Sequence, residues 1–292
     1  MSATTAQLLD GAALAASIRT ALTSQIEDLK RQGITPGLGT ILVGDDPASA
    51  TYVNLKHRDC AEVGIASFGE HLPTTASQAD VLEVIHAYNH NPAIDAFLVQ
   101  LPLPRGLDEE AALLAVDFEK DVDGLHPVNL GRLALGKPGP LPCTPAGIQA
   151  LLVAHGVPIA GQHVVIVGRG ITVGRPLAML LSLKAEHANA AVTVVHTGVS
   201  DMGSYTRQAD ILVAAAGAPG LITHDMVRPG AAVVGAGVVK QGSRLLSDVD
   251  ESVAQVAGWI TPRVGGVGPM TRAMLLRNTV RAAERRVHGG AV

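Results

Sequence analysis

The hydrophobic positions of the chain follow two periods in alternation. Apolar residues spaced three and four apart, as on one face of a helix, mark the stretches 11–31, 78–88, 145–155 and 173–184. Short continuous apolar runs lie between them, at 38–43, 96–101, 164–167, 191–195, 211–215 and 231–234. Such runs are typical of strands buried on both faces of a parallel sheet that helices cover. The pattern therefore predicts an α/β fold built on parallel strands.

Local capping residues indicate where several elements begin and end. Asp46 is a good N-cap, and Pro47 after it suits the first position of a helix. Asp108 is a second candidate N-cap, for a short helix that reaches Val116. Pro102 is expected to stop the strand before it, because proline cannot donate to a ladder.

The length of 292 residues exceeds the usual size of one domain and predicts two. Gly and Pro become dense between 131 and 145, as in a linker, so we place the boundary near Cys143. We expect an N-terminal α/β domain over 1–142 and a Rossmann-like nucleotide-binding domain over 143–270. The last amphipathic stretch, 270–287, is long enough to pack back on the first domain, so that 271–292 completes it.

Composition narrows the class of partner. The formal net charge is -4 and no basic run exceeds Arg285-Arg286, which excludes the electrostatic signature of a nucleic-acid or anionic-membrane binder and favours a small molecule. Two cysteines, Cys60 and Cys143, are too few for a disulfide framework or a Cys-x-x-Cys metal site, so we expect no metal. The N-terminal residues lack a signal peptide pattern and no stretch approaches a membrane span, so we expect a cytoplasmic protein.

A glycine-rich segment follows the apolar run 164–167. Gly168 permits a tight turn, Gly170 lets a diphosphate approach the backbone, and a helix then offers free N–H groups. The spacing G-x-G-x-x-x-G, which ends at Gly174, is one residue longer than the usual dinucleotide fingerprint. The alternative is a glycine turn that serves only strand–helix packing.

The next strand indicates which nicotinamide cofactor binds. An NAD enzyme places a carboxylate at its end for the ribose 2′-OH, whereas this chain has Val195, His196, Thr197 and Gly198 there. Arg169 and Arg175 flank the glycine turn and can bind a 2′-phosphate with forked guanidinium groups. NADP is therefore favoured over NAD, the alternative being that both arginines are solvated surface charges.

Several polar residues of the first domain can be interpreted either as functional or as purely structural. Tyr52 and Lys56 project from one helix face; short-chain dehydrogenases share this spacing but place it after the glycine fingerprint, so chain order argues against them. An ordinary amphipathic contact is the alternative. Gln100 ends a strand, where α/β sheets open towards ligands, or is a buried amide satisfied by backbone. Asp121 and Asp123 could be loop carboxylates that make local turn bonds.

Taken together, five segments resemble the bifunctional methylenetetrahydrofolate dehydrogenase/cyclohydrolase family, in the family's order and over roughly residues 8–285. They are 43–49 leading to Tyr52 and Lys56, then 99–104, 120–124, 142–145 and 265–271. The resemblance implies that 5,10-methylenetetrahydrofolate binds in a cleft between the domains and is oxidised by NADP⁺, and that water converts the 5,10-methenyl product to 10-formyltetrahydrofolate. It also implies a homodimer.

The resemblance assigns roles to individual residues. It makes Lys56 the central catalytic residue, with Gln100 adjusting it, Tyr52 packing on the aminobenzoyl ring and Asp123 binding the pterin. Desolvation and a cationic intermediate would disfavour the ammonium form of such a lysine, and Asp123 would have to accept from pterin N–H donors. The expected substrate-binding set adds Leu101, Pro102, Gly265 and Gly266. The expected cofactor-binding set is Thr144, Gly168, Arg169, Gly170, Thr172, Val173, Arg175, His196, Thr197, Ala216, Gly217, Val238 and Thr271.

Three departures from the family pattern lie in the nucleotide half. Val264 stands where the family has proline, Gly235 where it has aspartate, and Ser247 where it has the glycine before Asp248. None removes an expected catalytic side chain, so they bear on cofactor affinity.

Two rival interpretations remain. A shikimate- or amino-acid-dehydrogenase-like NADP oxidoreductase would need a cation for a substrate carboxylate and would not require Gln100 and Asp123. A non-catalytic nucleotide-binding homologue is disfavoured because Lys56, Gln100 and Asp123 are all present.

Overall fold

The computed structural model describes residues 6–241 and 244–287. They form two compact units, which we name by their sheets. The six-stranded unit comprises the residues up to Ala16 together with Pro142–Thr271, and the three-stranded unit comprises Ser17–Leu141 and the chain from Arg272 onward. No described helix is long and apolar enough to cross a membrane.

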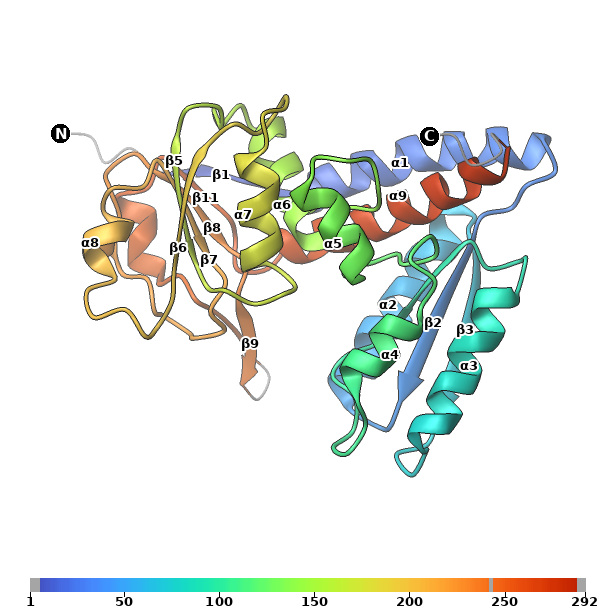
Figure 1. Ribbon diagram of the computed structural model, residues 1–292. Coiled ribbons are helices and arrows are strands. Elements are labelled where there is room, and N and C mark those ends of the chain that lie inside the picture. The colour runs from blue at the N-terminus through green and yellow to red at the C-terminus, as the bar shows by residue number, and fades with distance from the viewer. Residues whose placement is uncertain (1–5, 242–243, 288–292) are drawn as a thin grey trace. The chain divides into compact units, whose positions relative to one another are not determined.

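The three-stranded unit is built on a parallel sheet with the order β3-β2-β4. Its strands are β2 (Gly37–Val43), β3 (Ala66–Leu72) and β4 (Ala96–Val99), and its own helices are α2 (Pro47–Val63), α3 (Gln78–His90), α4 (Glu109–Ala115) and α5 (Pro127–Ala134). Figure 1 shows α2 and α3 on opposite sides of the sheet. Every residue of β2 is buried, as the apolar run predicts. Apolar side chains of all three strands, α3 and α4 share one core.

The six-stranded unit is built on an all-parallel sheet with the order β1-β11-β8-β7-β5-β6. Its strands are β1 (Gln7–Leu8), β5 (His163–Val167), β6 (Ala191–Val195), β7 (Ile211–Ala214), β8 (Ala232–Gly235) and β11 (Trp259–Ile260). The connections from β5 run first to β6 on one side and then past β5 to β7 on the other. The strand order therefore reverses between β5 and β7, and α/β proteins bind nucleotides beyond the carboxyl ends of the strands at such a point.

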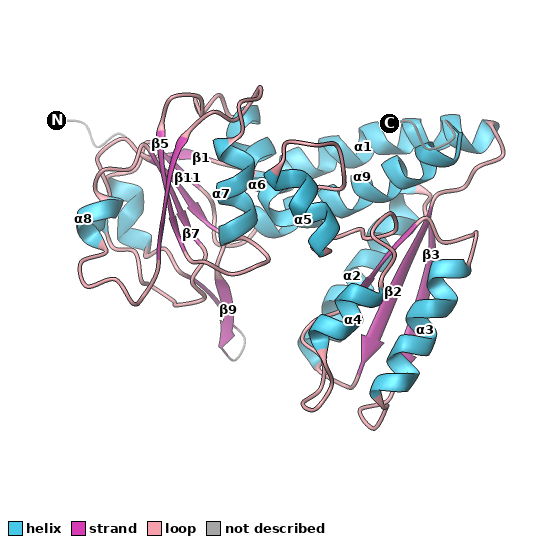
Figure 2. Ribbon diagram, in the orientation of Figure 1, coloured by secondary structure: helices cyan, strands magenta, loops and turns pink. Residues whose placement is uncertain are grey.

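Helices cover both faces of this sheet. They are α6 (Cys143–Ala154), α7 (Gly174–Ser182) and α8 (Gly203–Thr206), with two 3₁₀ turns, η1 (His224–Met226) and η2 (Glu251–Gln255). Figures 1 and 2 show α6 and α7 on one face and α8 on the other. Two further strands, β9 (Val238–Gln241) and β10 (Arg244–Ser247), pair antiparallel with each other.

Two long helices contribute residues to both units. They are α1 (Gly11–Arg31) and α9 (Val267–Val287). The later part of α9 is held in the three-stranded unit by side chains that reach it. The Asn278 amide donates to the carbonyls of Val122 and Leu141, and Arg286 pairs with Asp95. The prediction that the last helix packs on the first domain agrees with these contacts.

The predicted α/β class is confirmed, and Asp46 and Asp108 cap α2 and α4 as expected. The connecting segment is shorter than the predicted 131–145, because α5 extends to Ala134 and α6 begins at Cys143; the two units divide within the remaining residues, between Leu141 and Pro142. Pro127 is at the first position of α5, where its missing N–H costs nothing. β3 and the β9–β10 pair were not predicted, because they carry polar residues at exposed positions.

Candidate functional site

Lys56 and Gln100 meet at the carboxyl edge of the three-stranded sheet. Lys56 lies on α2, which starts after β2, and Gln100 directly follows β4. The ammonium nitrogen of Lys56 donates to Oε1 of Gln100 at 3.1 Å, and both side chains are half-buried. Because β2 is the central strand and the chain departs from it to both sides, this edge is also a point where the strand order reverses. The structure therefore brings together two residues that are 44 positions apart.

The orientation of the Gln100 amide is fixed by its remaining contacts. Nε2 donates to the carbonyl of Leu101 at 2.7 Å, and the backbone N–H donates to Ile41 in β2 at 2.8 Å. Oε1 is thereby directed to Lys56. The alternative interpretation, an amide whose partners are neighbouring backbone groups, applies to the side-chain nitrogen only. The side-chain oxygen accepts from Lys56.

Three groups close to Lys56 on α2, namely His57, Asp59 and Cys60, have a pKa shifted towards the neutral form or an ion-pair partner. His57 is hydrogen-bonded to the buried Thr40 at 3.0 Å, and burial, with a smaller effect of the Lys56 ammonium, lowers the pKa of its imidazole. Burial, with a smaller effect of Asp59, raises the pKa of the Cys60 thiol to about 12. Asp59 itself pairs with Arg272 of α9 at 2.7 Å.

The loop of Asp121 and Asp123 lies beside β4. Asp121 forms a parallel bridge with Phe97, so the chain continues along β4 and brings Asp123 towards its carboxyl end. Asp121 makes local turn bonds, as one interpretation of the sequence predicted. Its carboxylate accepts hydrogen bonds from the N–H groups of Gly124 and His126 and from the Asn129 amide. Asp123 is half-buried and lines a small pocket with Val99. Both carboxylates line this pocket, and they differ in burial, because Asp121 is buried among its local bonds and Asp123 is half-buried.

The other residues expected to bind substrate lie in both units. In the three-stranded unit Tyr52 is 53% exposed, which leaves its ring free to pack on a flat ligand, and Leu101 and Pro102 directly follow Gln100. Gly265 and Gly266 belong to the six-stranded unit. Gly265 has a φ of +86°, and a Cβ on Gly266 would stand 2.6 Å from the Pro262 carbonyl, so the chain itself requires glycine at both positions.

The glycine segment after β5 has the properties of a phosphate cradle. A Cβ on Gly168 would stand 2.1 Å from the Ala215 carbonyl, and one on Gly174 would stand 2.1 Å from the Gly168 carbonyl. Both glycines are thus required by close backbone packing. Gly170 has open space where its Cβ would be, and no side chain caps the N-terminus of α7 after Val173. The Arg175 N–H donates to the Gly170 carbonyl, so the free space at Gly170 and the uncapped start of α7 are the features that fit a dinucleotide diphosphate.

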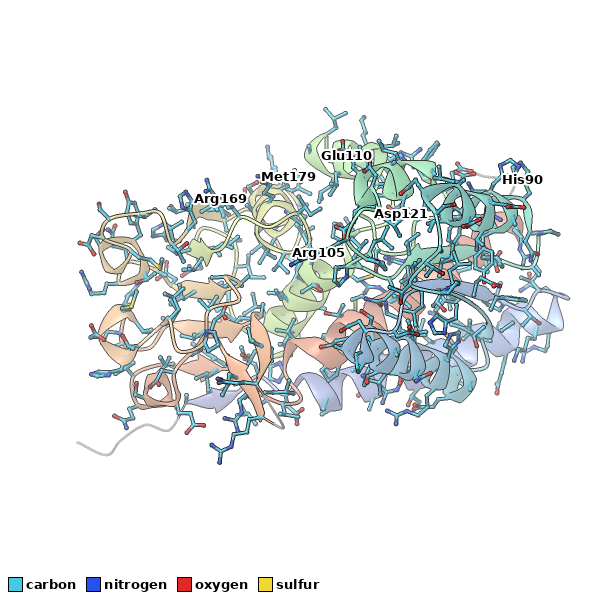
Figure 3. The ribbon with its side chains drawn as sticks, turned by 90° about the horizontal axis from the view of Figure 1, so that it is seen from below. His90, Arg105, Glu110, Asp121, Arg169 and Met179 are labelled. Atoms are coloured by element: carbon cyan, nitrogen blue, oxygen red, sulfur yellow. The ribbon has the colours of Figure 1, made fainter. Side chains whose placement is uncertain are left out.

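Residues expected to bind the cofactor gather at the same edge. Ala216 and Gly217 directly follow β7, the strand beside β5, and His196 and Thr197 directly follow β6 on its other side. Arg169, Thr172 and Arg175 are exposed around the glycine segment, and Figure 3 shows Arg169 at the surface. The end of β6 offers no carboxylate; the His196 ring accepts from the Gly198 N–H at 3.1 Å.

Three further residues of the expected cofactor set lie in the same unit. Thr144 and Thr271 form a hydrogen bond of 3.0 Å, and Val238, at the start of β9, is 42% exposed.

Comparison with known proteins identifies the family. Residues 9–123 match the tetrahydrofolate dehydrogenase/cyclohydrolase catalytic domain, and residues 142–287 match the NAD(P)-binding domain of the same family. The chain belongs to the tetrahydrofolate dehydrogenase/cyclohydrolase family. The resemblance of the five segments is thereby confirmed, and neither rival interpretation is favoured.

Individual relatives cover the chain nearly end to end. The bifunctional protein FolD of Syntrophotalea carbinolica is 57% identical over 281 residues, which are 96% of this chain and 97% of that protein. The crystal structure of FolD from Campylobacter jejuni is 44% identical, with a TM-score of 0.92 over 96% of this chain and 99% of that one. FolD of Trypanosoma brucei, solved with NADP and an inhibitor, is 40% identical, with a TM-score of 0.91 over 97% and 99%.

Two of the departures from the family pattern prove to be neighbours. A Cβ on Gly235 would stand only 2.7 Å from the hydroxyl oxygen of Ser247, which itself accepts from the Val249 N–H at 3.2 Å. The serine therefore occupies the space that a side chain at 235 would need. Val264 is 68% exposed, and nothing in the structure explains its replacement of proline.

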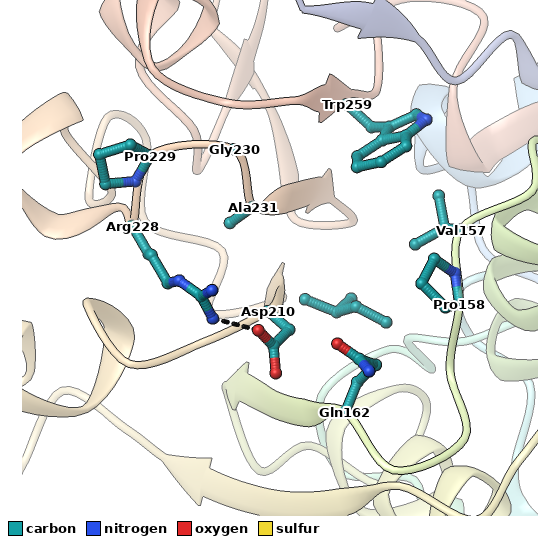
Figure 4. A pocket seen from close by; sticks show the side chains of 10 residues that line it. Val157, Pro158, Gln162, Asp210, Arg228, Pro229, Gly230, Ala231 and Trp259 are labelled. Atoms are coloured by element: carbon teal, nitrogen blue, oxygen red, sulfur yellow. Dashed lines mark hydrogen bonds and ion pairs between the residues drawn. The ribbon is translucent and has the colours of Figure 1, made fainter.

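One cavity of the six-stranded unit lies away from these residues. It has a volume of about 110 Å³ and is lined by Gln162, Asp210, Arg228 and Trp259, among others (Figure 4). These residues lie at or near the amino ends of the strands, whereas the glycine segment lies at the carboxyl ends. Arg228 is already paired with Asp210, so the cavity offers no free cation for an anionic substrate.

Sequence reasoning missed two residues that shape the candidate site. Asn278 joins α9 to the backbone of Val122, next to Asp123. Asp248 is fully buried and binds the backbone of Ala216 and Gly217. Neither follows a periodic pattern; the signal for Asp248 was its place directly after Ser247, one of the departures from the family pattern.

Proposed function

We propose that this protein oxidises 5,10-methylenetetrahydrofolate to 5,10-methenyltetrahydrofolate with NADP⁺ and hydrolyses the product to 10-formyltetrahydrofolate. The observation that carries the proposal is the Lys56–Gln100 hydrogen bond at a sheet edge in a chain that belongs to this family. We assign folate binding to 1–142, completed by 271–292, and nucleotide binding to 143–270. The protein is thus an oxidoreductase and a hydrolase of one-carbon metabolism.

NADP is the cofactor that suits the glycine cradle. The open backbone at Gly170 and the uncapped start of α7 suit the diphosphate, and Arg169 and Arg175 suit the 2′-phosphate. The other residues of the expected set, from Thr144 to Thr271, complete the cofactor contacts in this proposal. When bound, the nicotinamide accepts the hydride. The protein supplies alignment of the donor carbon, which is the main requirement of that step.

Lys56 acts in the hydrolytic step. Water that adds to the cationic methenyl carbon must lose a proton, and an amine in hydrogen-bonding reach can accept it. Gln100 holds Lys56 through a neutral oxygen, which accepts an N–H from either the ammonium or the amine and so does not demand the charged form. Gln100 is therefore a suitable partner for a lysine that changes its protonation state during turnover.

The remaining residues bind the folate. Tyr52 packs on the aminobenzoyl ring, Leu101 and Pro102 follow Gln100 along the ligand, and Asp123 accepts hydrogen bonds from the pterin. Gly265 and Gly266 complete the expected set. We also infer a homodimer in the cytoplasm; both statements are supported by the family resemblance.

One assay tests the combined activity. The purified protein is incubated with 5,10-methylenetetrahydrofolate and NADP⁺ while absorbance is followed at the NADPH and methenyl-folate bands. We expect NADPH to form with only transient methenyl-folate. Stable accumulation of methenyl-folate would contradict the cyclohydrolase, and no NADPH would contradict the dehydrogenase.

Replacing Lys56 should separate the two activities. Lys56→Gln keeps much of the length and hydrogen bonding but cannot act as a base, so cyclohydrolase should fall by about 10²- to 10⁴-fold while part of the dehydrogenase activity remains. Methenyl-folate should then accumulate. Arg58→Gln, at an exposed position of the same helix, is the control. Retained hydrolysis would exclude Lys56 as the base, and equal loss of both activities would indicate a binding role.

A further inference from the structure

A buried carboxylate lies behind the nucleotide-binding edge of the six-stranded unit. Asp248 directly follows β10 and has no exposed surface. Its Oδ2 accepts hydrogen bonds from the backbone N–H groups of Ala216 at 2.6 Å and Gly217 at 2.9 Å. Burying a carboxylate is costly unless it is hydrogen-bonded, so these two bonds are the compensation that the described structure provides. The other oxygen, Oδ1, has no partner among the described residues.

The two donors belong to the turn that follows β7. The Ala215 carbonyl in this turn lies where a Cβ on Gly168 would be, so the turn packs directly on the glycine cradle. Gly217 has a φ of +66°, which glycine adopts without strain. The turn is partly exposed, whereas the carboxylate that holds it is not. Asp248 therefore affects this edge only through its hydrogen bonds to the turn, because it has no exposed surface that a ligand could contact.

The Asp248 side chain packs closely against a glycine. A Cβ on Gly237 would stand 1.9 Å from Oδ2, so no other residue could occupy that position with the carboxylate in place. Gly237 and Ala236 also donate to the Ala214 carbonyl, the last residue of β7. One side chain, that of Asp248, is therefore in contact with the turn Ala215–Gly217 and with the residues that follow β8, which in turn bond to the end of β7.

We propose that Asp248 is a positioning residue of the dinucleotide site: it holds the Ala215–Gly217 turn against Gly168 and so fixes the wall of the crevice that receives the cofactor. The proposal rests on the NADP-dependent function given above. It assigns no contact between Asp248 and the cofactor. Its effect should therefore appear in nucleotide affinity and leave hydrolysis of methenyl-folate, which uses no nucleotide, much less affected.

The test compares Asp248→Asn and Asp248→Ala with Asp250→Asn. The asparagine keeps an acceptor for the two N–H groups without charge and buries an amide donor at the position of Oδ1, while the alanine removes both bonds. Asp250 caps η2 through Ser252 at an exposed position and is the matched control. NADPH affinity is measured by titration of its own fluorescence, folding by thermal unfolding, and cyclohydrolase activity from methenyl-folate without nucleotide.

We expect NADPH affinity to fall about three- to tenfold in Asp248→Asn and about ten- to a hundredfold in Asp248→Ala, with the control unchanged and cyclohydrolase reduced less than threefold. Asp248→Asn decides the matter if the alanine variant does not fold. Unchanged NADPH affinity in a folded Asp248→Asn overturns the proposal. So does an equal loss of NADPH affinity, thermal stability and cyclohydrolase activity, because that would indicate a general structural role. Failure of the proposed function would appear differently, as a wild-type protein that lacks one of the two activities.

Discussion

At the scale of single residues, the identity of the acceptor for Lys56 is the central feature of the site. A carboxylate, Asp59, lies only three positions further along α2, on the neighbouring turn of the helix. It is paired with Arg272, so the Lys56 amine is left to the neutral amide of Gln100. A carboxylate partner would favour the ammonium form and oppose its use as a base. The arrangement therefore suits a lysine that must release and accept a proton.

The two exposed arginines at the glycine segment should decide the choice between NADP⁺ and NAD⁺. A forked guanidinium–phosphate pair contributes about 1.5 to 3 kcal/mol, so Arg169→Ala or Arg175→Ala should weaken NADP⁺ roughly ten- to a hundredfold and leave NAD⁺ unchanged. Steady-state constants for both cofactors measure this. Arg228→Ala, at the opposite edge of the sheet, should change neither. If the preference for NADP⁺ survives both replacements, the 2′-phosphate binds elsewhere.

The two neighbouring departures, Gly235 and Ser247, should be energetically coupled. In Gly235→Ala the new Cβ displaces the Ser247 hydroxyl and breaks its bond to Val249, which should cost about 1 kcal/mol of unfolding free energy. The same change should cost much less in a Ser247→Gly background, where the space is free. A double-mutant cycle in denaturant measures the difference. Additive effects would show that the close approach carries no energy.

At the scale of elements, the pair between Asp59 and Arg272 joins α2 to α9 and should contribute asymmetrically to stability. The Asp59 side chain is 4% exposed and the Arg272 side chain 21%, and the paired atoms have no other hydrogen-bond partner among the described residues. Arg272→Met strands a buried carboxylate and should cost about 3 kcal/mol. Asp59→Ala should cost less, because the arginine can turn towards solvent.

The double variant Asp59→Ala/Arg272→Met should regain most of the lost stability, because no unpaired charge remains. Thermal unfolding of the three proteins measures this, at about 2 to 4 °C per kcal/mol for units of this size. A double variant as unstable as Arg272→Met would mean that packing, and not the unpaired charge, sets the cost.

Elements were predictable where one signal dominated. The fully buried β2 and the capped start of α2 agree with the sequence, because a continuous apolar run and an Asp-Pro cap have few other readings. β3 was missed because none of its residues is buried, so it has no apolar run. α5 was missed because its Pro127 and Gly131 resemble loop residues, although one begins the helix and the other is tolerated within it.

The site was predictable to a similar, partial extent. Lys56 and Gln100 were expected from the family resemblance, and the hydrogen bond between them required the fold, since parallel pairing of β2 and β4 brings their carboxyl ends together. The family resemblance singled out Asp123 from Asp121, whereas the local bonds of Asp121 required the fold. The role of Asp248 depends on contacts with residues more than thirty positions away, which no local pattern reports.

At the scale of the whole molecule, each unit carries one buried cysteine. Cys60 lies in the three-stranded unit with no exposed surface, and Cys143 lies in the six-stranded unit at 4% exposure. Burial and the Asp59 carboxylate raise the pKa of Cys60 to about 12, so little thiolate forms at pH 8. Neither thiol should react with a disulfide reagent in the native protein, and the rate of labelling should report the opening of the unit in which each thiol lies.

NADP⁺ should slow the labelling of Cys143 more than that of Cys60. A ligand at 100 times its Kd stabilises the unit that binds it by about 2.7 kcal/mol, which lowers the open population roughly a hundredfold. The glycine cradle and Cys143 belong to one unit, whereas Cys60 belongs to the other, and only α1 and α9 contribute described helical residues to both. Mass spectrometry of the labelled peptides, with and without NADP⁺, gives the two rates in one experiment. Equal protection of both thiols would mean that the two units open as one. Protection of Cys60 alone would place the nucleotide in the three-stranded unit and contradict the assignment of the cofactor site.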